Sequence, residues 1–174
     1  HLGAPDMNAV LNEVRDVCLE QGLSVYSTQT HEGFLRNLVV RTGSRTGELM
    51  VFLITSEHRP DLMEHFRGRL AGVLGDRLTT FVNGVTDRKN GVAFSDRDFV
   101  ISGPGWIRDR IGDCEFRISP NSFFQTHTAQ ADVLCEDVLR AAALTGEEIV
   151  YDLYCGAGTL TLAAARRCRR VLGV

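Results

Sequence analysis

The feature that most constrains this chain is the stretch VYDLYCGAGTLTL at residues 150–162. An apolar run ends in an acid, a short loop with two glycines follows, and an apolar helical pattern begins. This order predicts a strand, a tight loop and a helix, and RVLGV at residues 170–174 then supplies a second strand. The β-α-β unit therefore starts at about residue 148. Because EIVYDLY is largely apolar, we expect its strand to be buried on both faces.

The glycine loop indicates a binding site for a nucleotide-like cofactor. Gly156 and Gly158 have no Cβ, so a ligand can approach the main chain closely. Dinucleotide enzymes use GxGxxG, with an acid ~20 residues further on. Here CGAG gives only two glycines, and Asp152 stands on the preceding strand. An acid that could hold ribose hydroxyls would follow the second strand, beyond Val174, so we expect the cofactor site to be incomplete in this chain.

Before about residue 120 the pattern of apolar and turn residues is different. Apolar spacing predicts helices there, and β-branched or aromatic runs bounded by turn residues predict strands, two of them joined by the hairpin turn GSRTG. Another helix is expected at 129–144, just before the β-α-β unit. We therefore predict an α+β central domain, residues 1–118, followed by the truncated start of an α/β Rossmann-like domain, residues 119–174. The expected upstream elements are helices at 6–22 and 60–75 and strands within 23–28, 33–43, 48–56, 79–85 and 92–118.

Composition excludes several classes of protein. The net charge of -3 argues against a protein that binds nucleic acid through a net positive charge, although it permits a local basic patch. No apolar run is long enough to cross a bilayer. The five cysteines are odd in number and form no CxxC pair, which favours reduced thiols in a cytoplasmic protein over a disulfide framework or a zinc site. We expect no metal site.

Three blocks of sequence resemble one enzyme family. FRISPNSFFQTHTAQADVL at 116–134, the DLYCGAG block and the RVLGV strand are similar to the RNA uracil-5-methyltransferases, which make 5-methyluridine in ribosomal or transfer RNA. HEGFLRNLVVR at 31–41 and TGELMVFLIT at 46–55 resemble the central domain of that family. The resemblance implies a Rossmann-like methyltransferase domain, S-adenosyl-L-methionine as the cofactor, and RNA as the partner, with ribosomal RNA (rRNA processing) favoured over transfer RNA.

The resemblance also implies which residues contact the cofactor: Gln125, Tyr154 and Thr159, together with Gly156 and Gly158. Each side chain has a structural alternative. Gln125 could cap the helix that follows it, Tyr154 could pack in the core at a strand end, and Thr159 could be a first-turn helix residue that bonds the loop.

The chemistry of the family needs a cysteine that attacks uracil C6 and a base that removes the C5 proton. In the family both lie C-terminal to the cofactor strands, so we expect no catalytic residue in this chain and a structural role for Cys155. The closely spaced cysteines that hold an iron–sulfur cluster in some members are missing from this sequence, so no cluster is expected. The chain is thus predicted to be an enzyme fragment that does not turn over by itself.

Two other functions stay open at this point. One is a fragment of an oxidoreductase with a nucleotide cofactor, against which the spacing of the glycine loop counts. The other is a non-catalytic RNA-binding module, in which arginines of RRCRR at 166–170 and WIRDR at 106–110 contact phosphates. For RRCRR we favour the alternative that its arginines complement a helix dipole, because it follows a helix.

Overall fold

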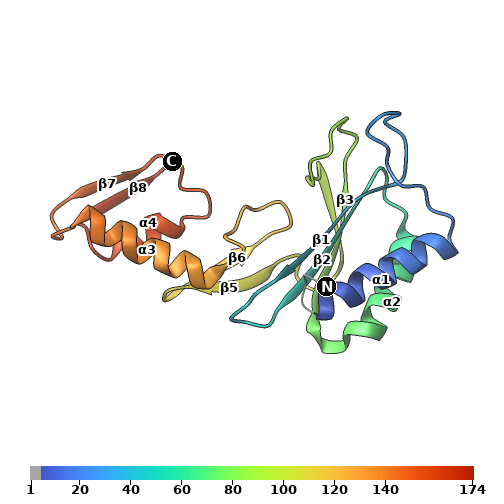
Figure 1. Cartoon of the computed structure of the whole chain (residues 1–174), viewed down its shortest axis with the longest axis horizontal. Helices are drawn as coiled ribbons and strands as arrows, with labels where there is room; N and C mark the ends of the chain where they lie inside the picture. The colour runs from blue at the N-terminus through green and yellow to red at the C-terminus, as the bar shows by residue number, and fades with distance from the viewer. Residues whose placement is uncertain (1–4) are drawn as a thin grey trace. The chain divides into compact units, whose positions relative to one another are not determined.

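The computed structural model describes residues 5–174 and divides into two compact units (Figure 1). The first unit contains the chain up to Gly43, then Gly47–Ile107 and Ser119–Asn121. The second unit contains Ser44–Thr46, Arg108–Ile118 and Ser122–Val174. Each unit mixes helices with strands, as the sequence predicts.

The first unit is a four-stranded sheet covered by two helices. The strands lie in the order β1-β2-β3-β4, with β2 and β3 parallel and the other neighbours antiparallel. The hairpin turn predicted between β1 and β2 is confirmed by the bond from Gly43 N to Glu48 O, 2.8 Å. The elements are α1 (Pro5–Glu20), β1 (Leu35–Thr42), β2 (Leu49–Thr55), α2 (Pro60–Leu74), the 3-10 turn η1 (Gly75–Arg77), β3 (Leu78–Val85) and β4 (Arg97–Ser102).

One predicted strand of this unit is wrong. Residues 23–28, LSVYST, form only an isolated bridge between Val25 and Leu35. The segment turns back at once through bonds such as His31 N to Ser27 O, 2.8 Å, so a ladder cannot extend along it. Its β-branched and aromatic residues have strand propensity, but the local turn decides the conformation.

The core of the first unit lies on both faces of β2, whose seven residues are all buried. On one face, Val51 and Leu53 belong to a cluster with Phe66 and Leu70 of α2. On the other face, Phe52 packs closely against Gly84 of β3. A Cβ added to Gly84 would lie 2.5 Å from Phe52 Cε2 and 2.7 Å from Ser95 Cβ, so this position has no room for a side chain.

Gly84→Ala should therefore destabilise the protein. Overpacking a tight core typically costs about 1–3 kcal/mol, and a fall of that size in the free energy of unfolding is expected in urea denaturation. Gly72→Ala is the matched control, because Gly72 lies in α2 with no heavy atom within 4 Å of an added Cβ among the described residues. It should stabilise the protein by about 0.5–1 kcal/mol. Equal effects of the two substitutions would contradict the packing described for Gly84.

The second unit contains the predicted β-α-β unit. Strands β7 and β8 are parallel and α4 connects them, with α3 and α4 along one face of the pair (Figure 1). An antiparallel ribbon precedes α3. The elements are β5 (Ile107–Ile111), β6 (Cys114–Ile118), α3 (Thr128–Ala142), β7 (Ile149–Asp152), α4 (Thr159–Ala165) and β8 (Arg170–Gly173).

The expectation that the strand at 148–154 is buried on both faces is wrong for the structure described here. Along β7 the side chains alternate between exposed and half-buried, and Ile149 and Tyr151 are exposed. The reason is that the sheet has two strands among the described residues and α4 packs against one of its faces. The side chains that alternate to the opposite face therefore meet solvent.

A buried carboxylate joins three segments of the second unit. Asp109 of β5 is 1% exposed, and it accepts hydrogen bonds from Ser44 N (3.1 Å), Ser44 Oγ (3.2 Å) and Arg45 N (2.9 Å). The Ser44 hydroxyl also lies 2.6 Å from Thr128 Oγ1, at the start of α3. Arg45 forms an ion pair with Asp132 of α3. Residues 44–46, the ribbon and α3 are thus held together by polar contacts.

Candidate functional site

The loop after β7 is tied to the end of β8 by main-chain bonds. Val174 N donates to Asp152 O at 2.9 Å, and Cys155 N donates to Val174 O at 3.1 Å. The Asp152 carboxylate, at the end of β7, accepts from the hydroxyl of Thr161 in α4 at 2.6 Å. Strand, loop and helix are therefore fixed to one another around Asp152.

The two glycines of the loop have main-chain conformations that disfavour a side chain. Gly156 has φ of 52° and Gly158 has φ of 82°, both in the left-handed region. Gly158 is the N-cap of α4, and its N–H donates to Cys155 O at 2.7 Å. A Cβ on Gly156 would meet no described heavy atom within 4 Å. The main chain at Gly156 therefore faces open space, as a ligand-binding loop requires.

A cavity of about 120 Å³ lies beside this loop and brings together most of the predicted site residues. Gln125, Tyr154, Gly156 and Thr159 line it, whereas Gly158 is not among its lining residues. Small-molecule sites commonly have volumes of ~300–1,000 Å³, so this cavity encloses only part of a cofactor. Its other lining residues are Phe123, Phe124, Asp152, Cys155, Ala157 and Leu160.

Two of the structural alternatives are wrong. The side chain of Tyr154 is not core packing, because the residue is 95% exposed. Gln125 does not cap α3, because His127 is the N-cap and its side chain accepts from Gln130 N at 3.2 Å. Thr159 is the first residue of α4, as its structural alternative supposes. Contact of these residues with a cofactor stays a prediction.

Phe123 is a lining residue that the sequence analysis does not single out. It is 73% exposed, so with Tyr154 it leaves two aromatic rings accessible beside the cavity. Its neighbour Phe124 is buried and packs on Phe116 of β6, with ring centroids 5.4 Å apart. This buried ring anchors the SFFQ segment to the ribbon. Phe123 and Gln125 both line the cavity, on either side of the buried Phe124. Their spacing of two residues is the signal that could have identified Phe123.

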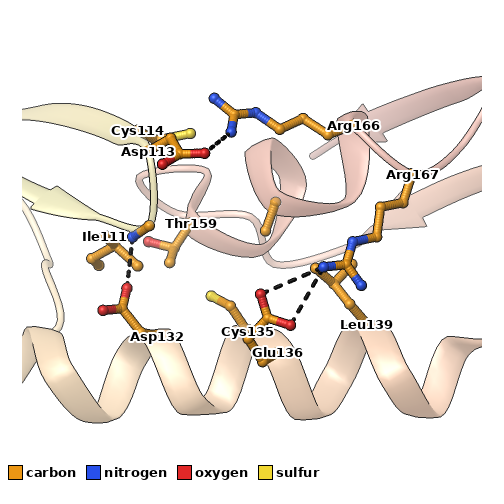
Figure 2. Close-up of a pocket in the computed structure, with 12 residues that line it drawn as sticks. Ile111, Asp113, Cys114, Asp132, Cys135, Glu136, Leu139, Thr159, Arg166 and Arg167 are labelled. Atoms are coloured by element: carbon orange, nitrogen blue, oxygen red, sulfur yellow. Dashed lines mark hydrogen bonds and ion pairs between the residues drawn. The ribbon is translucent and has the colours of Figure 1, made fainter.

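A second, larger cavity of about 330 Å³ lies between the β5–β6 turn, α3 and α4 (Figure 2). Ion pairs line it: Arg166 to Asp113 at 2.5 Å, and Arg167 to Glu136 at 3.4 Å. Two arginines of RRCRR therefore pair with carboxylates of their own unit, which neither interpretation of that segment anticipates. Cys135 also lines this cavity, and burial raises the pKa of its thiol, with smaller contributions from nearby carboxylates.

The turn before β7 is held by one carboxylate. Glu148 accepts from the Thr145 hydroxyl at 2.6 Å and from the main-chain N–H groups of Thr145 (2.9 Å) and Gly146 (3.1 Å). These bonds, with the Thr145 hydroxyl first, lower the pKa of Glu148 from 4.5 to about 2. The carbonyl of Glu148 accepts from Arg169 N at 3.0 Å, so the same residue links the turn to the start of β8.

The turn should consequently stay ordered in moderate acid. A lowered pKa means that the stabilisation is complete above about pH 4.5 and is lost as the pH falls through about 2. Hydrogen exchange should show the Thr145 and Gly146 amides still protected at about pH 3.5, after correction for intrinsic rates. Glu148→Gln should reduce this protection, because one amide oxygen replaces the two carboxylate oxygens that accept these bonds, and Glu147→Gln, the neighbouring control, should preserve it. Loss of protection in the unmodified protein near pH 4.5 would contradict the assignment.

The described residues were compared with three further features: a metal site, a disulfide and a membrane-spanning helix. Within residues 5–174, no group of three His, Cys, Asp or Glu side chains is arranged to hold a metal ion. The five cysteines form no disulfide. None of the described helices has the length and apolar character needed to span a membrane.

This chain is similar in sequence to RNA methyltransferases. No protein-family model matches it. It is 45% identical over 174 residues, its full length, to an uncharacterised RNA methyltransferase of Chlorobaculum tepidum. It is 37% identical over 169 residues (95% of the chain) to another from Halalkalibacterium halodurans. The chain spans 36% of the length of each of these relatives.

A solved structure extends the comparison to the fold. The crystal structure of Pyrococcus abyssi tRNA (uracil-54, C5)-methyltransferase in complex with S-adenosyl-L-homocysteine matches with a TM-score of 0.72 and 32% identity. The match covers 95% of this chain and 39% of that protein. The resemblance to RNA methyltransferases expected from the sequence blocks is thereby confirmed, and the mixed α/β fold is similar to that of this enzyme.

Proposed function

We propose that this chain, which is similar to RNA methyltransferases over its full length, is part of an enzyme that transfers a methyl group from S-adenosyl-L-methionine to C5 of a uridine in RNA. One observation carries the proposal. Gln125, Tyr154, Gly156 and Thr159, which the resemblance assigns to the cofactor, line one cavity. The similar Pyrococcus abyssi enzyme is bound to S-adenosyl-L-homocysteine, and its name specifies uracil C5.

The proposed substrate is RNA, either ribosomal or transfer. The sequence resemblance favours ribosomal RNA, whereas the solved relative is a transfer RNA enzyme. Both RNA types therefore belong in the tests below. We further propose that residues 1–118 form the central domain and residues 119–174 begin the cofactor-binding domain. A cytoplasmic location is proposed from the unpaired cysteines.

The lining residues fit part of a nucleoside cofactor. An exposed tyrosine ring can stack on a purine, and a glutamine amide both donates and accepts hydrogen bonds. Gly156, with open space beside its Cα, lets the main chain approach the ligand. When bound, S-adenosyl-L-methionine supplies the methyl group. Because the cavity is small, we expect residues from the rest of the protein to complete the site.

Gln125→Ala should weaken cofactor binding in a form of the protein extended to the length of its relatives. A typical hydrogen bond contributes ~0.5–1.5 kcal/mol, so its loss should weaken binding by up to about one power of ten. Calorimetric titration with S-adenosyl-L-homocysteine measures this directly. Gln130→Ala is the matched control, because Gln130 is exposed on α3 and does not line the cavity. The chain of 174 residues should bind the ligand weakly or not at all. Equal losses in the two variants, or tight binding to the shorter chain, would count against the assigned site.

Cys155 is proposed to have a structural role and not to be the nucleophile. A Cβ on Gly173 would lie 3.0 Å from Cys155 Cβ and 3.1 Å from its Sγ, so the thiol packs against β8. The weak bond from its Sγ to Gly156 O, 3.9 Å, also keeps the side chain within its own loop. A cysteine that attacks uracil C6 must instead reach the substrate ring.

The chain of 174 residues should accordingly transfer no methyl group. The measurement is incorporation of label from radiolabelled S-adenosyl-L-methionine into unmodified ribosomal and transfer RNA, relative to a blank without protein. The expected incorporation equals the blank, because neither the nucleophile nor the base is assigned to these residues. Incorporation that disappears in Cys155→Ala would overturn both the absence of catalysis and the structural role of Cys155.

A further inference from the structure

An apolar groove of about 380 Å³ runs between α1 and β1 in the first unit. Three apolar side chains on its walls are largely exposed: Leu11 (57%), Leu19 (74%) and Val25 (72%). Apolar surface that gathers in one exposed place marks an interaction site. We call this feature the α1–β1 groove; one wall includes Leu11, Val14, Cys18 and Leu19 of α1, and the other is formed by residues 35–38 of β1.

The β1 wall of the groove is a free strand edge. β1 is the terminal strand of its sheet and pairs with β2 on one side. Among the described residues, its other side is paired only at the isolated bridge between Leu35 and Val25. Beyond that bridge, alternate residues of β1 direct their N–H and C=O groups away from β2. An extended segment can therefore pair along β1 and place every second side chain in the groove.

The charged side chains of the groove are positive. Arg15 and Arg36 line it, and no described carboxylate does. Arg15 is paired with Asp16 at 2.8 Å. Arg36 instead lies over the ring of Tyr26, 3.6 Å from its centroid, and donates to main-chain oxygens of the β3–β4 loop. Since Arg36 has no carboxylate partner within the described residues, a carboxylate on a docked segment would be attracted to it.

These charges disfavour a second copy of the chain as the occupant. Two antiparallel copies of β1, paired about the midpoint of the strand, would bring Arg36 directly opposite Arg41 of the other copy. The strand, LRNLVVRT, contains no acidic residue that could offset this. Like charges directly opposite each other destabilise strand pairing. The arginines of this edge therefore act against self-association.

We propose that the α1–β1 groove binds an extended apolar segment with a carboxylate opposite Arg36, supplied by the remaining part of a longer form of this protein. The inference rests on the proposal above that the chain is part of a longer enzyme. The relatives have such a source, because the chain spans 36% of the length of each. A segment of the same polypeptide also binds without the loss of translational freedom that a separate partner has.

The test is hydrogen exchange in the chain of 174 residues and in a form extended to the length of its relatives. The quantity compared is the ratio of the exchange rates of amides 36–42 in the two forms. Exchange should be at least about 10-fold slower in the extended form, because strand pairing adds main-chain hydrogen bonds. Leu19→Gln should lower this ratio about 3–10-fold through loss of an apolar contact. Arg36→Gln should lower it about 2–5-fold, as for a partly exposed ion pair. Val92→Gln is the control, because Val92 is 61% exposed and does not line the groove.

Equal exchange of β1 in the two forms, or equal ratios for Leu19→Gln and Val92→Gln, would overturn the inference. A dimer of the chain of 174 residues in sedimentation, dissociated by Leu19→Gln, would overturn it too, because the occupant would then be a second copy. Arg36→Gln serves as the second variant if Leu19→Gln fails to fold.

The proposed function is judged by a separate measurement. S-adenosyl-L-homocysteine binding by the extended form should be unchanged in the groove variants. If that binding does not depend on Gln125 while β1 stays protected, the proposed function fails and the groove stands. If binding depends on Gln125 while β1 is unprotected, the groove fails and the proposed function stands.

Discussion

The second unit depends on the buried carboxylate of Asp109. An ionised carboxylate removed from water destabilises a protein by several kcal/mol unless hydrogen bonds satisfy its oxygens. Here Ser44 and Arg45 supply three donors, and the Ser44 hydroxyl extends the network to Thr128. The ribbon, residues 44–46 and the first residue of α3 therefore share one polar centre. The ribbon and the helix that follows the SFFQ segment both take their positions from it.

The order of elements around the cofactor site could be predicted from sequence, because it depends on local chemistry. A strand that ends in a glycine loop and enters a helix has few alternatives, and β7, α4 and β8 appear where the pattern places them. Gly156 and Gly158 adopt the positive φ values that only such residues adopt easily. That Gln125 lies beside this loop could be predicted only from the family resemblance, because no periodicity relates residues so distant in sequence.

What escaped prediction depends on tertiary context. The LSVYST segment has strand composition but forms a local turn, and alternate side chains of β7 are exposed because helices cover only one face of its sheet. Ion pairs from Arg166 and Arg167 join segments far apart in the chain, so neither a helix-dipole nor a phosphate interpretation of RRCRR could foresee them. Exposure of Phe123 likewise follows from Phe124 taking the buried position beside Phe116.

The bonds that tie the glycine loop to Val174 have a consequence for synthesis on the ribosome. The loop around Cys155 is translated before α4 and β8, but its main-chain partners at Val174 emerge after both. Until then Asp152 O and Cys155 N have only water to bond. The nascent loop is therefore a late-folding segment, and the cavity beside it acquires its shape only once the parallel partner strand has left the exit tunnel.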